Sequence, residues 1–207
     1  MDYVKHPQAI QSESLDFVGQ YTSALGLGPV EDQIYRRIIH TTGDPAIVPL
    51  IAHHPQFVTA VYQVLTKKNF TIYTDVNMIR TGISEHTVVS LGGQVVCRIG
   101  DAAVAAAASE AGETRAMTAA RMSQNLIKDN LVVVGNAPTA LFTILEMAAE
   151  GWAPAAIVGT PVGFVGAKES KELLEQADIP YLTIRGTRGG STIAAAVVNA
   201  LLYSLKD

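Results

Sequence analysis

The sequence has little of what several common kinds of site require. Its single cysteine, Cys97, excludes an internal disulfide and a thiol-based zinc site. Cys97 ends the run Gln-Val-Val-Cys, so we interpret it as a small core residue rather than a nucleophile. Aromatic residues make up only 6% of the chain, which does not favour an aromatic-rich binding surface.

Charged residues and long apolar runs are also scarce. The charged fraction is 16%, the net charge is −4, and the basic residues form no run longer than two, which gives no support to a nucleic-acid partner. No uncharged apolar run reaches the roughly 18 residues of a membrane span, and the alanine-rich block 102–108 is too short. The first residues lack the basic and apolar regions of a signal peptide. We therefore expect a cytoplasmic protein whose partners include neither nucleic acid nor a membrane.

The motifs of several large enzyme classes are missing as well. The chain has no GxGxxG dinucleotide pattern, no Walker A ending and no GxSxG elbow. His53 and His54 are adjacent, so they cannot share one face of a helix, and no paired-histidine metal spacing occurs. These absences predict a protein without a metal site, and nothing in the chain calls for a cofactor.

What the sequence does contain predicts one α/β domain over residues 1–207. Hydrophobic residues make up 48% of the chain, and short β-branched runs alternate with segments of helical periodicity. This alternation is typical of an open, mainly parallel sheet, here five-stranded, flanked by helices. The predicted strands are 71–76, 94–99, 131–135, 155–159 and 181–185. The predicted helices are 9–25, 32–40, 55–67, 114–128, 137–150, 165–176 and 191–205.

Polar loops follow the predicted strands, and ligands of open α/β sheets bind beyond the carboxyl ends of the strands. The strongest local signal is Arg-Gly-Thr-Arg-Gly-Gly-Ser at 185–191. Its glycines let the backbone approach a ligand, Ser191 can cap the next helix, and Arg185 and Arg188 add charge-assisted bonds. We interpret this loop as an anion site, the alternative being an ordinary strand-to-helix turn with exposed arginines.

Two further loops and one histidine are open to two interpretations each. Asn136 can cap the helix after it or face a ligand, with capping favoured by the sequence alone. The glycine-hinged loop 159–165 can lie flat against a large planar ligand or serve packing only. His40 lies at the carboxyl end of a predicted helix, which stabilises a protonated imidazole suited to acid catalysis. From the sequence alone, an exposed or satisfied histidine is the favoured interpretation of His40.

Taken together, these segments resemble the precorrin-8X methylmutase family, including its cobalt-precorrin-8 branch. The resemblance runs from residue 7 to residue 202, and its pieces are highly specific in this order. They are RIIHTTGD at 37–44, TDVNMIRTGI at 74–83, VGNAPTAL at 134–141, PVGFVGAKESK at 161–171 and RGTRGGS at 185–191.

The resemblance implies a homodimeric isomerase that holds a tetrapyrrole near its subunit interface. It moves a methyl group from ring carbon 11 to ring carbon 12, giving hydrogenobyrinate or its cobalt counterpart. His40 matches the family's catalytic histidine, the proton donor and acceptor that selects the tautomer for a 1,5-sigmatropic shift. Such a shift needs a flat apolar binding site and polar or basic groups that bind the substrate's carboxylates. The candidate substrate contacts are Ser14, Arg80, Thr81, Arg98, Arg115, Asn136, Arg185, Arg188, Gly189, Gly190 and Ser191.

Two rival functions fit parts of the sequence. A non-catalytic tetrapyrrole carrier would keep the loops and arginines but would not need His40. An α/β enzyme that binds a nucleotide or sugar phosphate is suggested by the 185–191 loop alone, and the missing Walker and dinucleotide motifs count against it.

Overall fold

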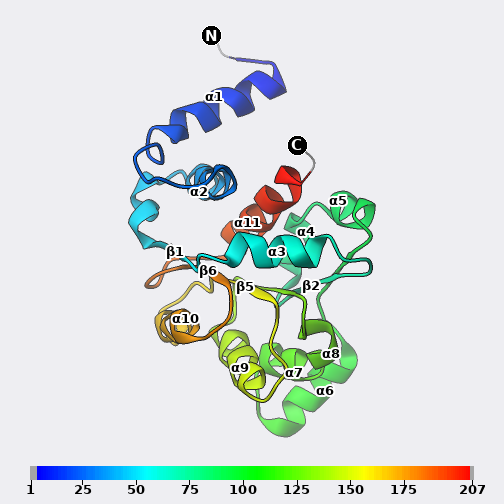
Figure 1. Ribbon diagram of the computed structural model, residues 1–207. Helices are drawn as coiled ribbons and strands as arrows, with labels where there is room; N and C mark the ends of the chain where they lie inside the picture. The colour runs from blue at the N-terminus through cyan, green and yellow to red at the C-terminus, as the bar shows by residue number, and fades with distance from the viewer. Residues whose placement is uncertain (1–3, 206–207) are drawn as a thin grey trace.

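Short strands of mainly aliphatic residues form one sheet at the centre of the molecule (Figure 1). The computed structural model describes residues 4–205, and residues 1–3 and 206–207 lie outside it. Residues 1–3 begin the amino-terminal segment on which the expected cytoplasmic location was partly based. The strand order is β1-β6-β5-β4-β2-β3, and every neighbouring pair is parallel except β1 with β6. The strands are β1 (Ile51–His53), β2 (Thr71–Thr74), β3 (Gln94–Val96), β4 (Leu131–Val134), β5 (Ala156–Gly159) and β6 (Tyr181–Ile184).

The predicted α/β fold is confirmed, and the predicted number of strands is wrong by one. All five predicted strands are present as β2 to β6, and β1 is the additional strand. It pairs antiparallel with β6, with Ile51 opposite Ile184 and His53 opposite Leu182. With only three residues, β1 is too short to show a period in the sequence.

Helices cover both faces of the sheet. Strands β2, β4, β5 and β6 are buried along their whole length, as expected of parallel strands covered on both sides. One apolar cluster joins the sheet to the first helical layer, and a second cluster joins it to the other layer. Figure 1 shows the two layers on opposite faces of the sheet. The first layer contains α2 (Pro29–Thr42), α3 (Phe57–Leu65), α4 (Asn77–Gly82), α5 (Glu85–Ser90) and α11 (Ser191–Ser204). The second contains α7 (Arg115–Arg121), α8 (Gln124–Ile127), α9 (Pro138–Ala149) and α10 (Ala167–Gln176), with α6 (Ala102–Ala111) against α7.

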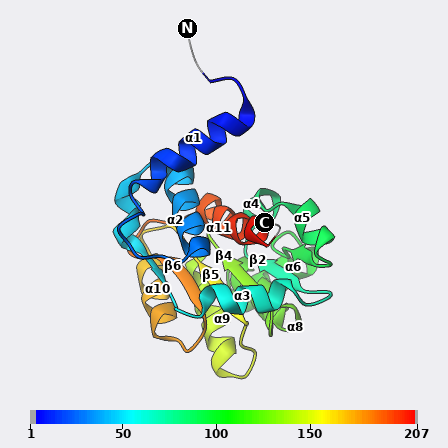
Figure 2. The same cartoon turned by 45° about the horizontal axis from the view of Figure 1, so that its top comes forward.

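The amino-terminal helix stands apart from these layers. Helix α1 (Pro7–Gly19) packs against α2 and points away from the sheet, as Figures 1 and 2 show. It leaves large apolar side chains in solvent, including Ile10 and Phe17. The 3-10 helix η1 (Pro45–Leu50) then leads from α2 into β1. Within residues 4–205, no helix has the length and apolar character to cross a bilayer.

The predicted helices are present with shifted ends, and some were missed. The predicted helix 114–128 is divided into α7 and α8, separated at Met122 and Ser123. Helices α4 and α5 are six residues each, too short for a helical period to stand out. The alanine-rich block forms α6, which ends at Gly112 in the left-handed conformation (φ 65°).

Candidate functional site

The carboxyl edge of the sheet carries a buried carboxylate between β2 and β4. Asp75 is 1% exposed and accepts hydrogen bonds from the backbone N–H groups of Gly135 (3.2 Å), Asn136 (3.0 Å) and Ala137 (2.7 Å). Burial raises the pKa of the Asp75 carboxyl, and these backbone hydrogen bonds oppose the rise. Asp75 therefore fixes the turn from β4 into α9 from inside the protein.

Replacing Asp75 with asparagine is expected to lower the free energy of unfolding by about 2–3 kcal/mol, because charge-assisted hydrogen bonds are lost and an amide NH₂ then faces backbone N–H groups. Urea unfolding followed by circular dichroism measures this loss. Asp178→Asn, at an exposed aspartate, is the matched control and should change stability by less than about 0.5 kcal/mol. Equal stability of the two variants would contradict the role given to Asp75.

This arrangement corrects one prediction about Asn136. The residue that precedes α9 is Ala137, which makes no side-chain cap, and the side chain of Asn136 is exposed. Asn136 is therefore not the helix cap: it lies one residue before the cap position, and its own backbone amide is bound by the Asp75 carboxylate. The other interpretation, in which the Asn136 side chain faces a ligand, stays a prediction.

The glycine loop after β6 is joined to the loop after β5. Gly190 N–H donates to the Thr160 carbonyl (2.8 Å), and Gly163 N–H donates to the Thr187 carbonyl (3.2 Å). A Cβ atom on Gly189 would overlap the Thr160 carbonyl oxygen, so this position needs glycine. The two loops therefore form one surface, which we call the double loop (residues 160–166 and 185–190).

Ser191 was expected to cap α11, and the structure corrects this. Ser191 is the first helical residue and is buried, while Gly190 occupies the cap position without a side-chain hydrogen bond. Because α11 begins without a side-chain cap, its first backbone amides at the double loop suit an anion. The anion interpretation of this loop accordingly stays a prediction.

The two arginines of this loop differ in their surroundings. Arg185 makes a bidentate ion pair with Glu175 (Arg185 Nη2 to Glu175 Oε2, 2.7 Å), and its backbone N–H donates to the Leu50 carbonyl. Arg188 Nη1 contacts Asp44 Oδ2 at 2.6 Å. Asp44 directly follows Gly43, the left-handed residue (φ 62°) that ends α2. Arg188 therefore connects the double loop to the end of the helix that carries His40.

His40 opens into a groove between α1 and the end of α2. The groove has a volume of about 590 Å³, and its lining includes Ser14, Phe17, Tyr21 and His40. The structure thus brings together His40 and Ser14, which lie 26 positions apart in the sequence. Phe17 (67% exposed) and Tyr21 stack edge to face with ring centroids 6.2 Å apart. The predicted site did not include these two aromatic residues, although their spacing of four on one predicted helix indicated that their side chains lie side by side.

The remaining candidate contacts occupy other parts of the same edge. Arg80 and Thr81 are exposed on α4, after β2, and Arg115 is exposed at the start of α7. Arg98 binds Asp101 (2.8 Å) and the Met122 carbonyl (2.9 Å), so its guanidinium already supports the loop after β3.

Cys97 is half-buried near this edge. Burial raises the pKa of the Cys97 thiol, the opposite of what a nucleophilic cysteine needs. Among residues 4–205, no three His, Cys, Asp or Glu side chains lie together in a way that would hold a metal ion.

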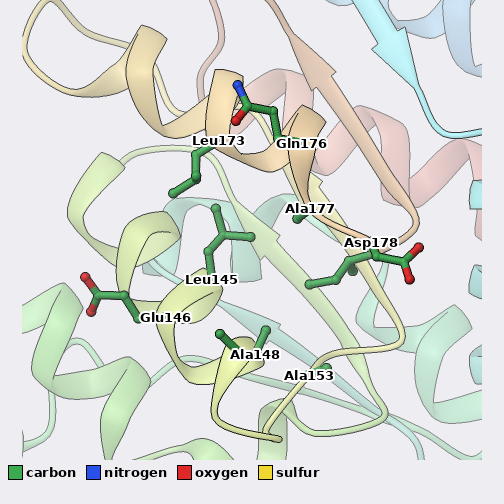
Figure 3. Close-up of a pocket in the computed structure, with 10 residues that line it drawn as sticks. Leu145, Glu146, Ala148, Ala153, Leu173, Gln176, Ala177 and Asp178 are labelled. Atoms are coloured by element: carbon green, nitrogen blue, oxygen red, sulfur yellow. The ribbon is translucent and has the colours of Figure 1, made fainter.

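A second groove lies at the opposite, amino-terminal edge of the sheet (Figure 3). It has a volume of about 550 Å³ and lies between α9 and α10, with Leu145, Leu173 and several alanines in its lining. None of the predicted site residues lines it. The candidate site is therefore the carboxyl edge, with the His40 groove beside the double loop.

The sheet is open and mainly parallel, and its carboxyl edge carries both the polar loops and the groove lined by His40. These features define an α/β protein with its ligand site at that edge. The family model for precorrin-8X methylmutase matches residues 9–204. The chain belongs to the precorrin-8X methylmutase family, whose members are isomerases of cobalamin biosynthesis.

Similar proteins agree with this assignment. The cobalt-precorrin-8 methylmutase of Salmonella typhimurium is 36% identical over 213 residues, covering 100% of both chains. The precorrin-8X methylmutase of Pseudomonas aeruginosa is 37% identical, covering 97% of each chain. The solved precorrin-8X methylmutase of Thermus thermophilus has a TM-score of 0.87 and 32% identity, covering 96% of this chain and 98% of its own.

Proposed function

We propose that the protein moves the methyl group on ring carbon 11 of precorrin-8X, or of cobalt-precorrin-8, to ring carbon 12. The products are hydrogenobyrinate and cobyrinate, respectively. Family membership supports the reaction, and one observation of the site carries the proposal: an exposed imidazole, His40, opens into a groove beside an arginine-bearing double loop. Because the methyl group migrates within the substrate, the protein needs to supply only a proton-transfer group and a surface that fits the substrate.

In this proposal His40 donates a proton to the macrocycle and accepts one back, which selects the tautomer in which the methyl group can migrate. The end of α2 is held firmly for this purpose. Gly43 N–H donates to the Ile39 carbonyl (2.8 Å), and Asp44 binds both Arg188 and the backbone N–H of Ala46 (2.9 Å). An imidazole that faces an open groove from a helix end held in this way is suited to proton transfer at one ring position.

The other candidate contacts divide by their availability. Arg80 and Arg115 are exposed and can meet substrate carboxylates, together with the first amides of α11. Arg188 is exposed as well, and its ion pair with Asp44 must open or be shared for it to do so. Arg98 and Arg185 are engaged by protein groups, so their role is to support the loops unless those ion pairs open. Ser14, Thr81, Asn136, Gly189, Gly190 and Ser191 remain proposed neutral contacts.

The proposal also includes a homodimer in the cytoplasm, with residues 1–207 as one domain. Exposed apolar side chains on and beside α1, among them Ile10, Phe17 and Leu25, support an interface with a second copy. Phe164 and Val165, at 93% and 90% exposure on the double loop, add a second apolar surface. Light scattering of the purified protein should give twice the chain mass.

The test of the function is turnover followed by visible absorption. Purified protein is mixed with precorrin-8X and, in parallel, with cobalt-precorrin-8, and conversion to the corrin product is expected. The conversion is visible in the absorption spectrum because the conjugated system of the macrocycle changes. The faster substrate identifies the branch. A spectral shift on binding without conversion would favour the carrier instead, and no spectral change with either compound would contradict both.

A further inference from the structure

A buried lysine lies directly beneath the double loop. Lys171, on α10, is 1% exposed, and its Nζ donates a hydrogen bond to the Arg188 carbonyl at 2.7 Å. A lysine is almost never fully buried unless it is paired with an acid. Here the partner is a backbone carbonyl, so the ammonium brings a positive charge under the loop instead of cancelling a nearby negative one.

The contacts of Lys171 extend in two steps to Asp44, beside the end of the helix that carries His40. Its partner carbonyl belongs to Arg188, whose guanidinium contacts Asp44 at 2.6 Å, next to the end of α2. On its other side, Arg188 precedes Gly189 and Gly190, which are held against the Thr160 carbonyl. Lys171 therefore fixes the backbone from which Arg188 reaches the His40 helix and at which α11 begins.

The charged groups around Lys171 are already paired with others. On α10 itself, Lys168 pairs with Glu172 (3.6 Å), and Glu175 pairs with Arg185 from the end of β6. On α9, which packs against α10, Glu146 is at the far groove and lies 3.9 Å from Arg121. The groups that face Lys171 or its helix are thus Lys168, Glu172, Glu175, Tyr181, Arg185 and Arg188, with Glu146 and Glu150 at the distant end of α9.

We propose that Lys171 is a positioning residue for substrate carboxylates: its buried ammonium holds the Arg188–Gly190 backbone and places a positive charge behind the anion-binding face of the double loop. This inference rests on the proposed function, because the ligand must be a polycarboxylate. A buried charge is screened little by water or salt, so it attracts a ligand carboxylate more strongly than an exposed lysine would.

The proposal has a pH dependence of defined sign. Burial lowers the pKa of the Lys171 ammonium to about 8, so the free protein holds this charge below pH 8 and loses it above. A bound carboxylate stabilises the ammonium and raises its pKa. Affinity for a polycarboxylate is therefore highest below pH 8 and falls as the pH rises beyond it, and binding near pH 8.5 takes up a proton.

The experiment measures the affinity of the whole protein for hydrogenobyrinate, the expected product, by visible absorption between pH 6.5 and 9.5. Wild type is compared with Lys171→Met, which is unbranched and only one atom shorter than lysine but carries no charge. Lys168→Met is the matched control, because Lys168 lies on the same helix with its side chain 59% exposed. Calorimetry at pH 8.5 in two buffers of different ionisation enthalpy counts the protons taken up.

Lys171→Met is expected to bind at least about tenfold more weakly at pH 7 and to lose both the fall in affinity above pH 8 and the proton uptake. Lys168→Met should match wild type in all three. Wild-type affinity that is flat across this range without proton uptake would overturn the inference, as would a Lys171→Met profile equal to that of wild type. If Lys171→Met does not fold, the wild-type profile and proton uptake decide alone. Either result leaves the proposed function standing as long as wild type converts precorrin-8X.

Discussion

Replacing His40 with alanine is expected to lower turnover of precorrin-8X by about 10²- to 10⁴-fold, the usual contribution of a general acid or base. The side chain is exposed at the end of α2 and opens into the groove that it shares with Ser14. Removing an exposed imidazole costs the fold little, so the change should appear in the rate and not in stability. Single-turnover absorption measurements with saturating enzyme report the chemical step directly.

The same variant should still bind the corrin product, with an affinity within a few-fold of wild type, since the arginines and the double loop are untouched. His86→Ala, at an exposed histidine on α5, is the matched control and should turn over at the wild-type rate. Wild-type turnover by His40→Ala would show that another group transfers the proton, and the family assignment would still stand.

Gly189→Ala should be the most damaging of the conservative loop substitutions. A methyl group there would overlap the Thr160 carbonyl oxygen and lie 2.9 Å from that of Pro161, and both are backbone atoms that cannot rotate away. We expect the free energy of unfolding to fall by about 3 kcal/mol, at the upper end for overpacking. Product affinity should fall as well, because the hydrogen bond of Gly190 to Thr160 belongs to the same contact.

Gly186→Ala separates this clash from the backbone cost of losing a glycine. Gly186 belongs to the same loop and has φ +75°, yet a Cβ atom there would meet nothing within 4 Å. Its cost should be the left-handed conformation alone, about 1–2 kcal/mol. Urea unfolding of both variants measures the difference. Two equal losses would mean that the double loop adapts to the added methyl group and is less rigid than its contacts indicate.

The sequence predicted the sheet well because its parallel strands are buried on both faces and so appear as continuous aliphatic runs. Strand β1 escaped because its three residues directly follow a 3-10 helix, whereas β3, equally short and also at an edge, begins a longer apolar run. The short helices α4 and α5 escaped for a similar reason, since six residues span fewer than two helical turns. Strands and helices that appear as longer runs in the sequence were therefore predicted, and the elements of three to six residues that lack such a run were not.

The residue types of the candidate site can be read from the sequence, whereas its contacts cannot. His40 and Ser14 do share a groove, and the loop segments do line one edge of the sheet. The cap assignments of Asn136 and Ser191 were wrong, because α9 begins one residue later than an Asn136 cap requires and α11 begins one residue earlier than a Ser191 cap requires. The turn before α9 is held instead by Asp75, which is distant in sequence. Such pairings depend on which loops the fold places together, and spacing along the chain does not record them.

Both margins of the sheet are three-residue strands, β1 on one side and β3 on the other. Short edges offer few unpaired backbone groups, which protects a β-rich centre from joining another molecule strand to strand. Self-association by sheet extension is therefore disfavoured at either margin. If the protein pairs with a second copy, it must do so through helices and loops, and the two copies would then meet where the apolar side chains of α1 and the double loop already face outward.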